Sequence, residues 1–424
     1  MIARILDFSV AQRWLVVLLV AAAAGFGLRS LQSLPIDAVP DITNNQVQIN
    51  TVAPALSPLE VEKQVTYPVE TALAGIKGLR STRSLSRNGF SQVVAIFRDD
   101  VDIYYARQQV LERLSDAREL LPEGVEPRMG PISTGLGEVL MWTVEFVPPG
   151  EGGAAPREGR PGWQPDGGYL TPEGQRLETD LEKAAYLRTV QDWIIRPQMR
   201  TVPGVAGVDA IGGYVKQYHV EPDPARLIGL GLSFGDVAEA LERNNASRGA
   251  GYIERGGEGI VVRSGGRLET MDDIRNVVVA TREGVPVRVR DVAQVLIGPE
   301  LRTGSASADG RQVVVGTALM LIGENSRTVA AAVDAKVREI ARSLPAGVQL
   351  RTVLDRTELV DATVRTVAKN LAEGALLVVV VLFLLLGDLR AAVVTALVIP
   401  VTMLLTATGM LESGISANLM SLGA

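Results

Sequence analysis

The chain has 424 residues, of which 47% are hydrophobic and 4% aromatic, and its formal net charge at pH 7 is −6. It contains no cysteine and one histidine, which excludes disulfides, thiolate zinc sites and catalytic thiols. The acidic balance, without a long basic run, argues against nucleic acid as a partner.

The first predicted element is a membrane span. Residues 14–28 are uncharged and strongly apolar, and Arg13 and Arg29 flank them. Long arginine stems reach the interface, so a helix within residues 1–33 is able to cross a bilayer. The alternative is a cleaved signal peptide with Arg4 and Arg13 as its basic region. The further apolar runs near the other end of the chain favour the membrane span.

Strand-like runs and helix starts then alternate. The strand-like runs are residues 46–52, 90–97, 139–146 and 311–322. Capping boxes, in which a Ser or Thr N-cap precedes an acid by three residues, mark helix starts at Ser57 with Glu60, Thr179 with Glu182, and Ser233 with Asp236. Apolar residues at helical spacing predict another helix over 103–121. The segment between the apolar ends of the chain is therefore predicted to contain both strands and helices.

One segment departs from this alternation. Residues 148–174 are dominated by glycine and proline. Such a composition predicts a mobile surface loop without regular secondary structure.

Two helix ends resemble each other. Residues 110–125 and 333–348 each close on Leu-Pro-x-Gly-Val. A proline soon after a helix and a glycine in the turn would end both helices alike. The order of elements around each copy predicts repeated βαββαβ units. The alternative is that the two ends share only local helix-end chemistry.

A serine hydrolase is considered because residues 231–235, "GLSFG", match the G-x-S-x-G pattern around Ser233. That triad runs serine, acid, histidine along the chain, whereas His219 precedes Ser233. Ser233 also fits a helix N-cap better than a strand-to-helix elbow. His219 is interpreted as a strand residue at a solvated edge, with metal ligation as its alternative.

Two further spans are predicted near the other end. The apolar run over 371–387 is followed, after a tight turn, by 391–411, in which Pro400 is expected to cause a kink. Arg390 in the turn and the basic residues before the first span belong in the cytoplasm under the positive-inside rule. The segment between the first and second spans is then periplasmic in a bacterium.

The sequence contains neither a nucleotide-binding motif nor a zinc-protease motif. There is no G-x-x-x-x-G-K-[ST] loop and no H-E-x-x-H, so ATP-driven transport and zincin proteolysis lack their parts. Methionine is sparse outside the apolar runs, so nothing argues for Cu(I) coordination, whereas converging carboxylates would suit harder divalent cations. No catalytic residue and no cofactor are predicted.

Several long motifs resemble one family. They are "LPIDAVPDITNNQVQI", "SPLEVEKQVTYPVETALAGIKGL", "MGPISTGLGEVLMWTVE", "QDWIIRPQMRTVPGV", "GAGYIERGGE", "MLIGENSRTV" and "ISANLMSLGA". The resemblance is to the resistance-nodulation-division superfamily, and within it to the heavy-metal efflux branch of the cobalt-zinc-cadmium type. It runs over the whole chain except residues 148–174.

The resemblance implies a membrane α-helical bundle plus an α+β periplasmic domain, with ferredoxin-like βαββαβ porter units and an inserted docking subdomain. The implied order is a first transmembrane helix in 1–33, porter unit 1 in 34–138, porter unit 2 in 139–221 and 311–364 around a docking subdomain in 222–310, a second helix in 365–387, a third in 391–411, and the start of a truncated fourth in 414–424. The chain is therefore expected to be an N-terminal fragment.

The resemblance also implies how such a protein works. Its members are trimeric proton antiporters of the bacterial inner membrane, paired with a periplasmic adaptor (membrane fusion) protein and an outer-membrane channel. Their proton-relaying acids are expected just beyond Ala424. Glu373, the acid within an apparent span, is interpreted as an interfacial residue.

Two acids match metal-binding positions of zinc-exporting relatives. They are Glu138 in "GLGEVL" and Asp192 in "VQDW". The alternatives are a solvated loop acid for Glu138 and a locally paired helical acid for Asp192.

The function expected is export of Zn²⁺, Co²⁺ or Cd²⁺. One alternative is a copper or silver pump of the same architecture. A second is a membrane-anchored periplasmic binding or docking protein without transport.

Overall fold

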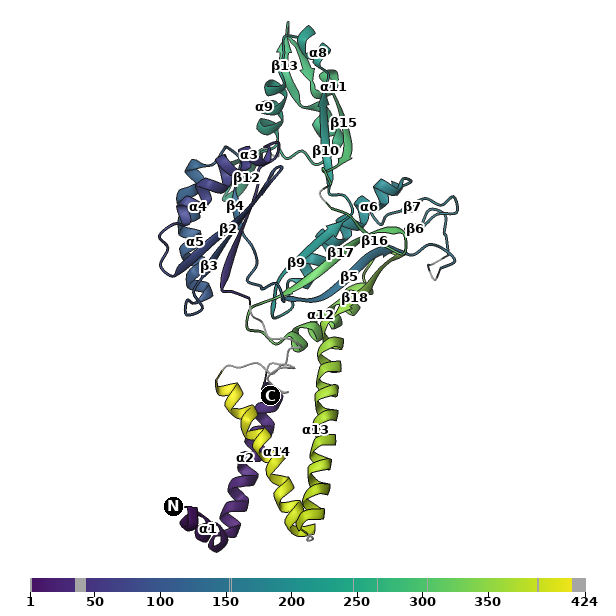
Figure 1. The fold of residues 1–424 in the computed structure, drawn as a ribbon. Helices are drawn as coiled ribbons and strands as arrows, with labels where there is room; N and C mark the ends of the chain where they lie inside the picture. Colours follow the sequence, from purple (N-terminus) through teal and green to yellow (C-terminus); the bar gives the residue numbers. More distant parts are fainter. Residues whose placement is uncertain are drawn as a thin grey trace. The chain divides into compact units, whose positions relative to one another are not determined.

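A computed structural model of the chain describes residues 2–34, 43–151, 153, 155–246, 248–264, 266–302, 304–386 and 389–413 (Figure 1). The chain divides into two compact units. Unit 1 comprises Met1–Ala154, Gln191–Ala210 and Val315–Ala424, and unit 2 comprises Ala155–Val190 and Ile211–Val314. The expected start of a fourth span, residues 414–424, lies outside the described residues.

The first sheet of unit 1 has the strand order β2-β3-β1-β4. Its elements in chain order are β1 (Gln46–Val52), α3 (Pro58–Val61), η1 (Glu62–Thr66), α4 (Tyr67–Leu73), β2 (Leu79–Arg87), β3 (Phe90–Phe97), α5 (Ile103–Ala117), η2 (Arg118–Leu120) and β4 (Pro127–Met129). The strand, helix, strand, strand, helix, strand order is that of a βαββαβ unit. Alternating residues of β1 and β3 are buried with the apolar stripe of α5, including Val47, Val93 and Val110.

A second, five-stranded sheet has the order β16-β17-β5-β18, with β9 also paired to β17, and its short strand β16 covers Ala306–Ala308. Its elements are β5 (Glu138–Phe146), η3 (Val190–Ile195), α7 (Arg196–Met199), β9 (Val205–Gly212), β17 (Arg311–Met320), α12 (Ser326–Ala341) and β18 (Val348–Asp355). Apart from the short strand β16, the pairing of β9, β17, β5 and β18 repeats that of β2, β3, β1 and β4 in the first sheet.

The two helix ends singled out in the sequence adopt the same turn. After α5 the Val125 N–H donates to Pro122 O at 3.1 Å, and after α12 the Val348 N–H donates to Pro345 O at 3.0 Å. The glycines of the two turns, Gly124 (φ 80°) and Gly347 (φ 87°), both adopt left-handed backbone. The likeness of residues 110–125 and 333–348 thus extends to their backbone.

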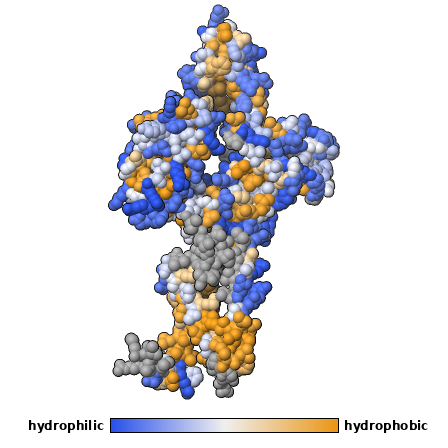
Figure 2. All heavy atoms as spheres, in the orientation of Figure 1, coloured by the Kyte–Doolittle hydropathy of each residue, from blue (hydrophilic) through white to orange (hydrophobic). Residues whose placement is uncertain are grey.

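Four helices of unit 1 lie outside its two sheets and are rich in apolar residues: α1 (Ile2–Ala11), α2 (Arg13–Ser33), α13 (Arg356–Leu386) and α14 (Leu389–Glu412). Two stretches of the described residues, Arg13–Leu31 and Val394–Glu412, are long and apolar enough to cross a membrane, and α13 contains a shorter apolar stretch, Ala372–Leu385. Apolar residues gather over α2, α13 and α14 in Figure 2.

Helices α2 and α14 approach each other closely at a glycine. A Cβ placed on Gly27 would lie 2.6 Å from the carbonyl oxygen of Leu404. Nearby, the Thr408 hydroxyl donates to Ser30 Oγ at 3.3 Å. Small residues that allow close backbone contact, together with polar contacts between helices, are typical of association within a bilayer.

Unit 2 contains a small core between short strands and helices. Its elements are β6 (Gly162–Trp163), β7 (Tyr169–Leu170), β8 (Arg176–Leu177), α6 (Asp180–Thr189), β10 (Lys216–Pro222), α8 (Pro224–Gly229), α9 (Phe234–Asn244), β11 (Arg248–Arg255), β12 (Glu258–Ser264), α10 (Met271–Asn276), β13 (Val278–Arg282), β14 (Val285–Arg288), α11 (Val289–Val292), β15 (Ala293–Pro299) and β16 (Ala306–Ala308). Strand β10 pairs with β15, and helices α8 to α11 bury their apolar residues with β13 to β15.

The prediction that residues 148–174 lack regular structure is wrong. They supply β6 and β7 of a three-stranded sheet completed by β8. The side chain of Tyr169 is fully buried there, with its ring centroid 5.7 Å from that of Trp163. Gly167 and Gly174, both with positive φ, close the two hairpin turns. The glycine content therefore serves tight turns around a buried aromatic residue.

Candidate metal-binding carboxylates

Glu138 is the first residue of β5, and its side chain is exposed. The loop before it is held at three points. The Gly137 N–H donates to Thr134 O at 3.0 Å, the Met320 N–H donates to Gly137 O at 2.7 Å, and the Arg356 guanidinium donates to Leu136 O. The backbone at Glu138 is therefore fixed while its carboxylate faces outward.

Asp192 lies in the π-helical segment η3, and its carboxylate is paired. Arg196 Nη2 lies 2.9 Å from Asp192 Oδ1, and the two side chains are 30% and 16% exposed. The spacing of four residues places both groups on one helix face. The structure thus shows Asp192 as a helical acid that pairs locally, which was the alternative interpretation of this residue.

The π-helical turn is fixed by its neighbour Gln191. The Trp142 indole N–H on β5 donates to Gln191 Oε1 at 3.0 Å, and both side chains are fully buried. Pro197 follows as the second residue of α7. Proline has no N–H to donate to the carbonyl four residues earlier, so the series of α-helical hydrogen bonds is interrupted at this point. The π-helical turn η3 occurs next to this interruption.

The structure does not bring Glu138 and Asp192 into a completed metal site. No group of three or more His, Cys, Asp or Glu side chains able to hold a metal occurs among the described residues. One carboxylate faces solvent and the other is engaged by an arginine. Two carboxylates are fewer ligands than zinc or cobalt usually takes from a protein, so these residues can supply at most part of a coordination shell.

Two side chains beside Asp192 were not predicted as part of the site. Arg196 could have been found from its i,i+4 spacing to Asp192. Trp193 is 78% exposed, which is unusual for a tryptophan. The sequence offered no signal for this exposure, because the π-helical turn that places the side chain outside is not visible in the residue pattern.

His219 and Ser233 have structural roles. His219 lies on β10 opposite Leu296, with its ring over Gly298, whose added Cβ would be 2.4 Å from the imidazole. Ser233 is the N-cap of α9, and its hydroxyl accepts from the Asp236 N–H at 3.2 Å. Both placements agree with the strand and N-cap interpretations.

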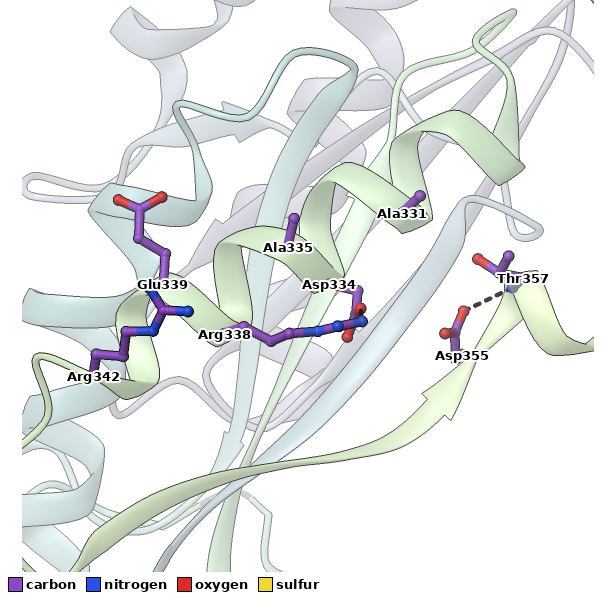
Figure 3. A pocket seen from close by; sticks show the side chains of 8 residues that line it. All are labelled: Ala331, Asp334, Ala335, Arg338, Glu339, Arg342, Asp355 and Thr357. Carbon is purple, nitrogen blue, oxygen red and sulfur yellow. Dashed lines mark hydrogen bonds and ion pairs between the residues drawn. The ribbon is translucent and has the colours of Figure 1, made fainter.

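A charged groove of about 650 Å³ is lined by residues of α12 and the β18–α13 junction (Figure 3). Its lining includes Asp334, Glu339 and Asp355, but the carboxylates do not converge. Asp334 pairs with Arg338, Asp355 accepts from the Thr357 N–H at 2.7 Å, and Glu339 points away from both (Figure 3). Neither Glu138 nor Asp192 lines this groove.

The acid in the apolar part of α13 is paired at the helix surface. Lys369 Nζ lies 3.8 Å from Glu373 Oε1, and both side chains are more than 60% exposed. The interfacial position of Glu373 stays a prediction.

Comparison with known proteins identifies the family. Residues 5–424 match the model of the AcrB/AcrD/AcrF family. The whole chain is 57% identical to the nickel and cobalt resistance protein CnrA and 54% identical to the cobalt-zinc-cadmium resistance protein CzcA, both of Cupriavidus metallidurans. It is 37% identical to the cation efflux system protein CusA of Escherichia coli.

The solved structures agree with this assignment. A crystal structure of a heavy metal efflux pump aligns with 99% of this chain at a TM-score of 0.83 and 32% identity, and the match covers 39% of that pump's chain. The chain likewise spans 39% of the length of CnrA and 38% of the length of CzcA. Its fold is that of the corresponding part of such pumps, with mixed helices and sheets. The chain therefore belongs to the AcrB/AcrD/AcrF family, on the heavy-metal efflux branch of the resistance-nodulation-division superfamily.

Proposed function

We propose that this chain serves in the export of divalent heavy-metal cations, with cobalt, nickel, zinc and cadmium as the candidate cargoes. The observation that carries the proposal is identity of 54% or more, over the whole chain, to proteins named for resistance to these metals. Nickel was not among the cations expected from the sequence, and no residue pattern distinguishes it from cobalt.

The proposed mechanism is proton-driven alternating access in an inner-membrane trimer with a periplasmic adaptor and an outer-membrane channel. The two βαββαβ arrangements of unit 1 would be the porter units, and residues 222–310 of unit 2 the docking subdomain. Helices α2, α13 and α14 would be multi-pass membrane spans, which their apolar stretches support.

The proposed cation contacts of this chain are Glu138 and Asp192. Carboxylate oxygens suit divalent cations of this series. Further ligands would have to complete the shell, since the described residues hold no third one beside these two. The exposure of Glu138 favours a role in first capture, and the partial burial of Asp192 favours retention.

The test is metal tolerance of the source bacterium with substitutions at the chromosomal locus. Glu138→Gln and Asp192→Asn should each lower tolerance to Co²⁺ or Ni²⁺ while leaving Ag⁺ tolerance unchanged. Glu126→Gln is the matched control, because Glu126 is an exposed acid of the same unit. Loss of silver tolerance alone would favour the copper and silver alternative, and unchanged tolerance to every metal after deletion would favour the binding-protein alternative.

A further inference from the structure

The Asp192–Arg196 pair places a cation of the protein itself on a proposed metal ligand. Arg196 Nη2 reaches Asp192 Oδ1 at 2.9 Å, in a position where the carboxylate is only 16% exposed. A guanidinium has no lone pair to offer a metal, so it cannot act as a ligand beside the carboxylate. A divalent cation at this carboxylate would also be repelled by the adjacent positive charge.

The pair is held loosely on the arginine side. Arg196 Nε is buried and has no hydrogen-bond partner among the described residues. Strong arginine–carboxylate pairs use two parallel N–H donors, and an unpartnered buried donor weakens the arrangement. Moving the Arg196 guanidinium away from Asp192 therefore costs less free energy than moving one whose N–H groups all have hydrogen-bond partners.

The backbone on the carboxylate side is anchored through the neighbouring residue. Gln191, the residue before Asp192, is anchored on Trp142 within the buried face of η3. This contact holds the backbone of the π-helical turn in place next to Asp192. Arg196 has a long flexible stem, which makes it the partner that moves.

We infer that Arg196 is an internal competitor for the cation: its guanidinium occupies Asp192 in the empty state, leaves when a divalent cation arrives, and returns to favour release. The inference rests on the proposed function, since it concerns regulation of the same carboxylate. A transport site has to bind its cargo weakly enough to let it go. A returning arginine supplies that weakness without a change in the ligand.

The test uses quenching of Trp193 fluorescence, because this exposed side chain adjoins Asp192 and Ni²⁺ quenches indole only at short range. The full chain in detergent is titrated with NiCl₂, and the signal of the Trp193→Phe variant is subtracted. Arg196→Met should lower the apparent Kd about tenfold, as expected when a competing positive charge is removed from the carboxylate. Arg196→Gln should act in the same direction, and Arg196→Lys should stay within about twofold of the parent because it keeps the charge.

The matched control is Arg338→Met, which removes the i,i+4 partner of Asp334 on α12 and should leave the Kd unchanged. Circular dichroism verifies the fold of each variant. If Asp192→Asn weakens Ni²⁺ binding but neither neutral variant of Arg196 strengthens it, the competitor role is overturned and the metal site stands. If Asp192→Asn leaves binding unchanged, Asp192 is not a ligand, and the proposed site falls together with the inference.

Discussion

The Trp142 indole N–H donates a hydrogen bond to Gln191 Oε1 at 3.0 Å, and neither side chain is exposed to solvent. Replacing Gln191 with leucine would leave the indole N–H buried without an acceptor. We expect a loss of about 1 kcal/mol in the free energy of unfolding, because leucine also removes the buried Gln191 Nε2, which has no hydrogen-bond partner among the described residues. The measurement is denaturant unfolding followed by circular dichroism.

The control for this prediction is a double-mutant cycle. Trp142→Phe removes the indole donor, so Gln191→Leu added to it should destabilise clearly less than in the parent. Strict additivity of the two substitutions would contradict an energetic role for the hydrogen bond.

Gly27 is expected to be intolerant of any side chain. The Cβ of Gly27→Ala would lie 2.6 Å from Leu404 O, so α2 and α14 must move apart. Since the chain has no cysteine, the pair Ser30→Cys and Thr408→Cys reports this contact by disulfide cross-linking. Gly27→Ala should reduce the cross-linking rate severalfold.

Gly25 provides the matched control on the same helix. A Cβ there would meet nothing within 4 Å. Gly25→Ala should leave the cross-linking rate unchanged, and equal effects of the two substitutions would show that helix propensity, not close approach, governs the rate.

The capping boxes should make the fold acid-sensitive. Hydrogen bonds from the side chain and backbone of Ser57 lower the pKa of Glu60 below 4.5, and those from the backbone and side chain of Ser233 lower the pKa of Asp236 below 3.8. Each folded pKa lies below the unfolded value. The two carboxylates therefore stabilise the folded state fully above their unfolded pKa values, and this stabilisation is lost as the pH falls through their folded pKa values.

Thermal unfolding between pH 5 and pH 3 measures this loss. Glu60→Gln combined with Asp236→Asn should flatten the decline of Tm with falling pH. Asp116→Asn combined with Glu119→Gln, at exposed positions outside the capping boxes, should leave the slope as it is. A flattening by the second pair as large as that by the first would mean that general charge repulsion causes the acid loss.

The small sheet around Tyr169 should depend on that side chain. Tyr169→Ala removes the buried ring that contacts Trp163 and Tyr186. We expect trypsin cleavage after Arg157 to accelerate roughly tenfold or more, because local opening becomes easier. Tyr104→Ala, at a 60% exposed position on α5, should not change the cleavage rate there.

The sequence was sufficient where local rules agree with burial. Strands β1 and β3 occupy the predicted residues because apolar side chains alternate along them. The three predicted capping boxes form with both of their hydrogen bonds. The predicted helix over 103–121 ends earlier, at Ala117, because a 3₁₀ turn carries the chain to Leu120 before the proline turn.

The sequence was insufficient where a tertiary contact decides. Glycine and proline in 148–174 suggested a loop, but the buried ring of Tyr169 organises short strands there. At the candidate site the acids were visible in the motifs. The engagement of Asp192 by Arg196 and the outward position of Trp193 depend on the π-helical turn, which residue spacing does not reveal.

Helix α13 begins at Arg356, the residue after β18 ends, and runs unbroken for 31 residues to Leu386. Arg356 donates a hydrogen bond to Leu136 O, and Asp361 forms an ion pair with Arg327 of α12 at 3.0 Å. These two contacts hold the first turns of the helix against the sheet and α12. At 1.5 Å per residue the helix is about 46 Å long, and a tilt of about 5° displaces its far end by roughly 4 Å. A rotation of the helix about its sheet end would therefore displace the apolar segment by several times the distance moved by the residues beside Glu138.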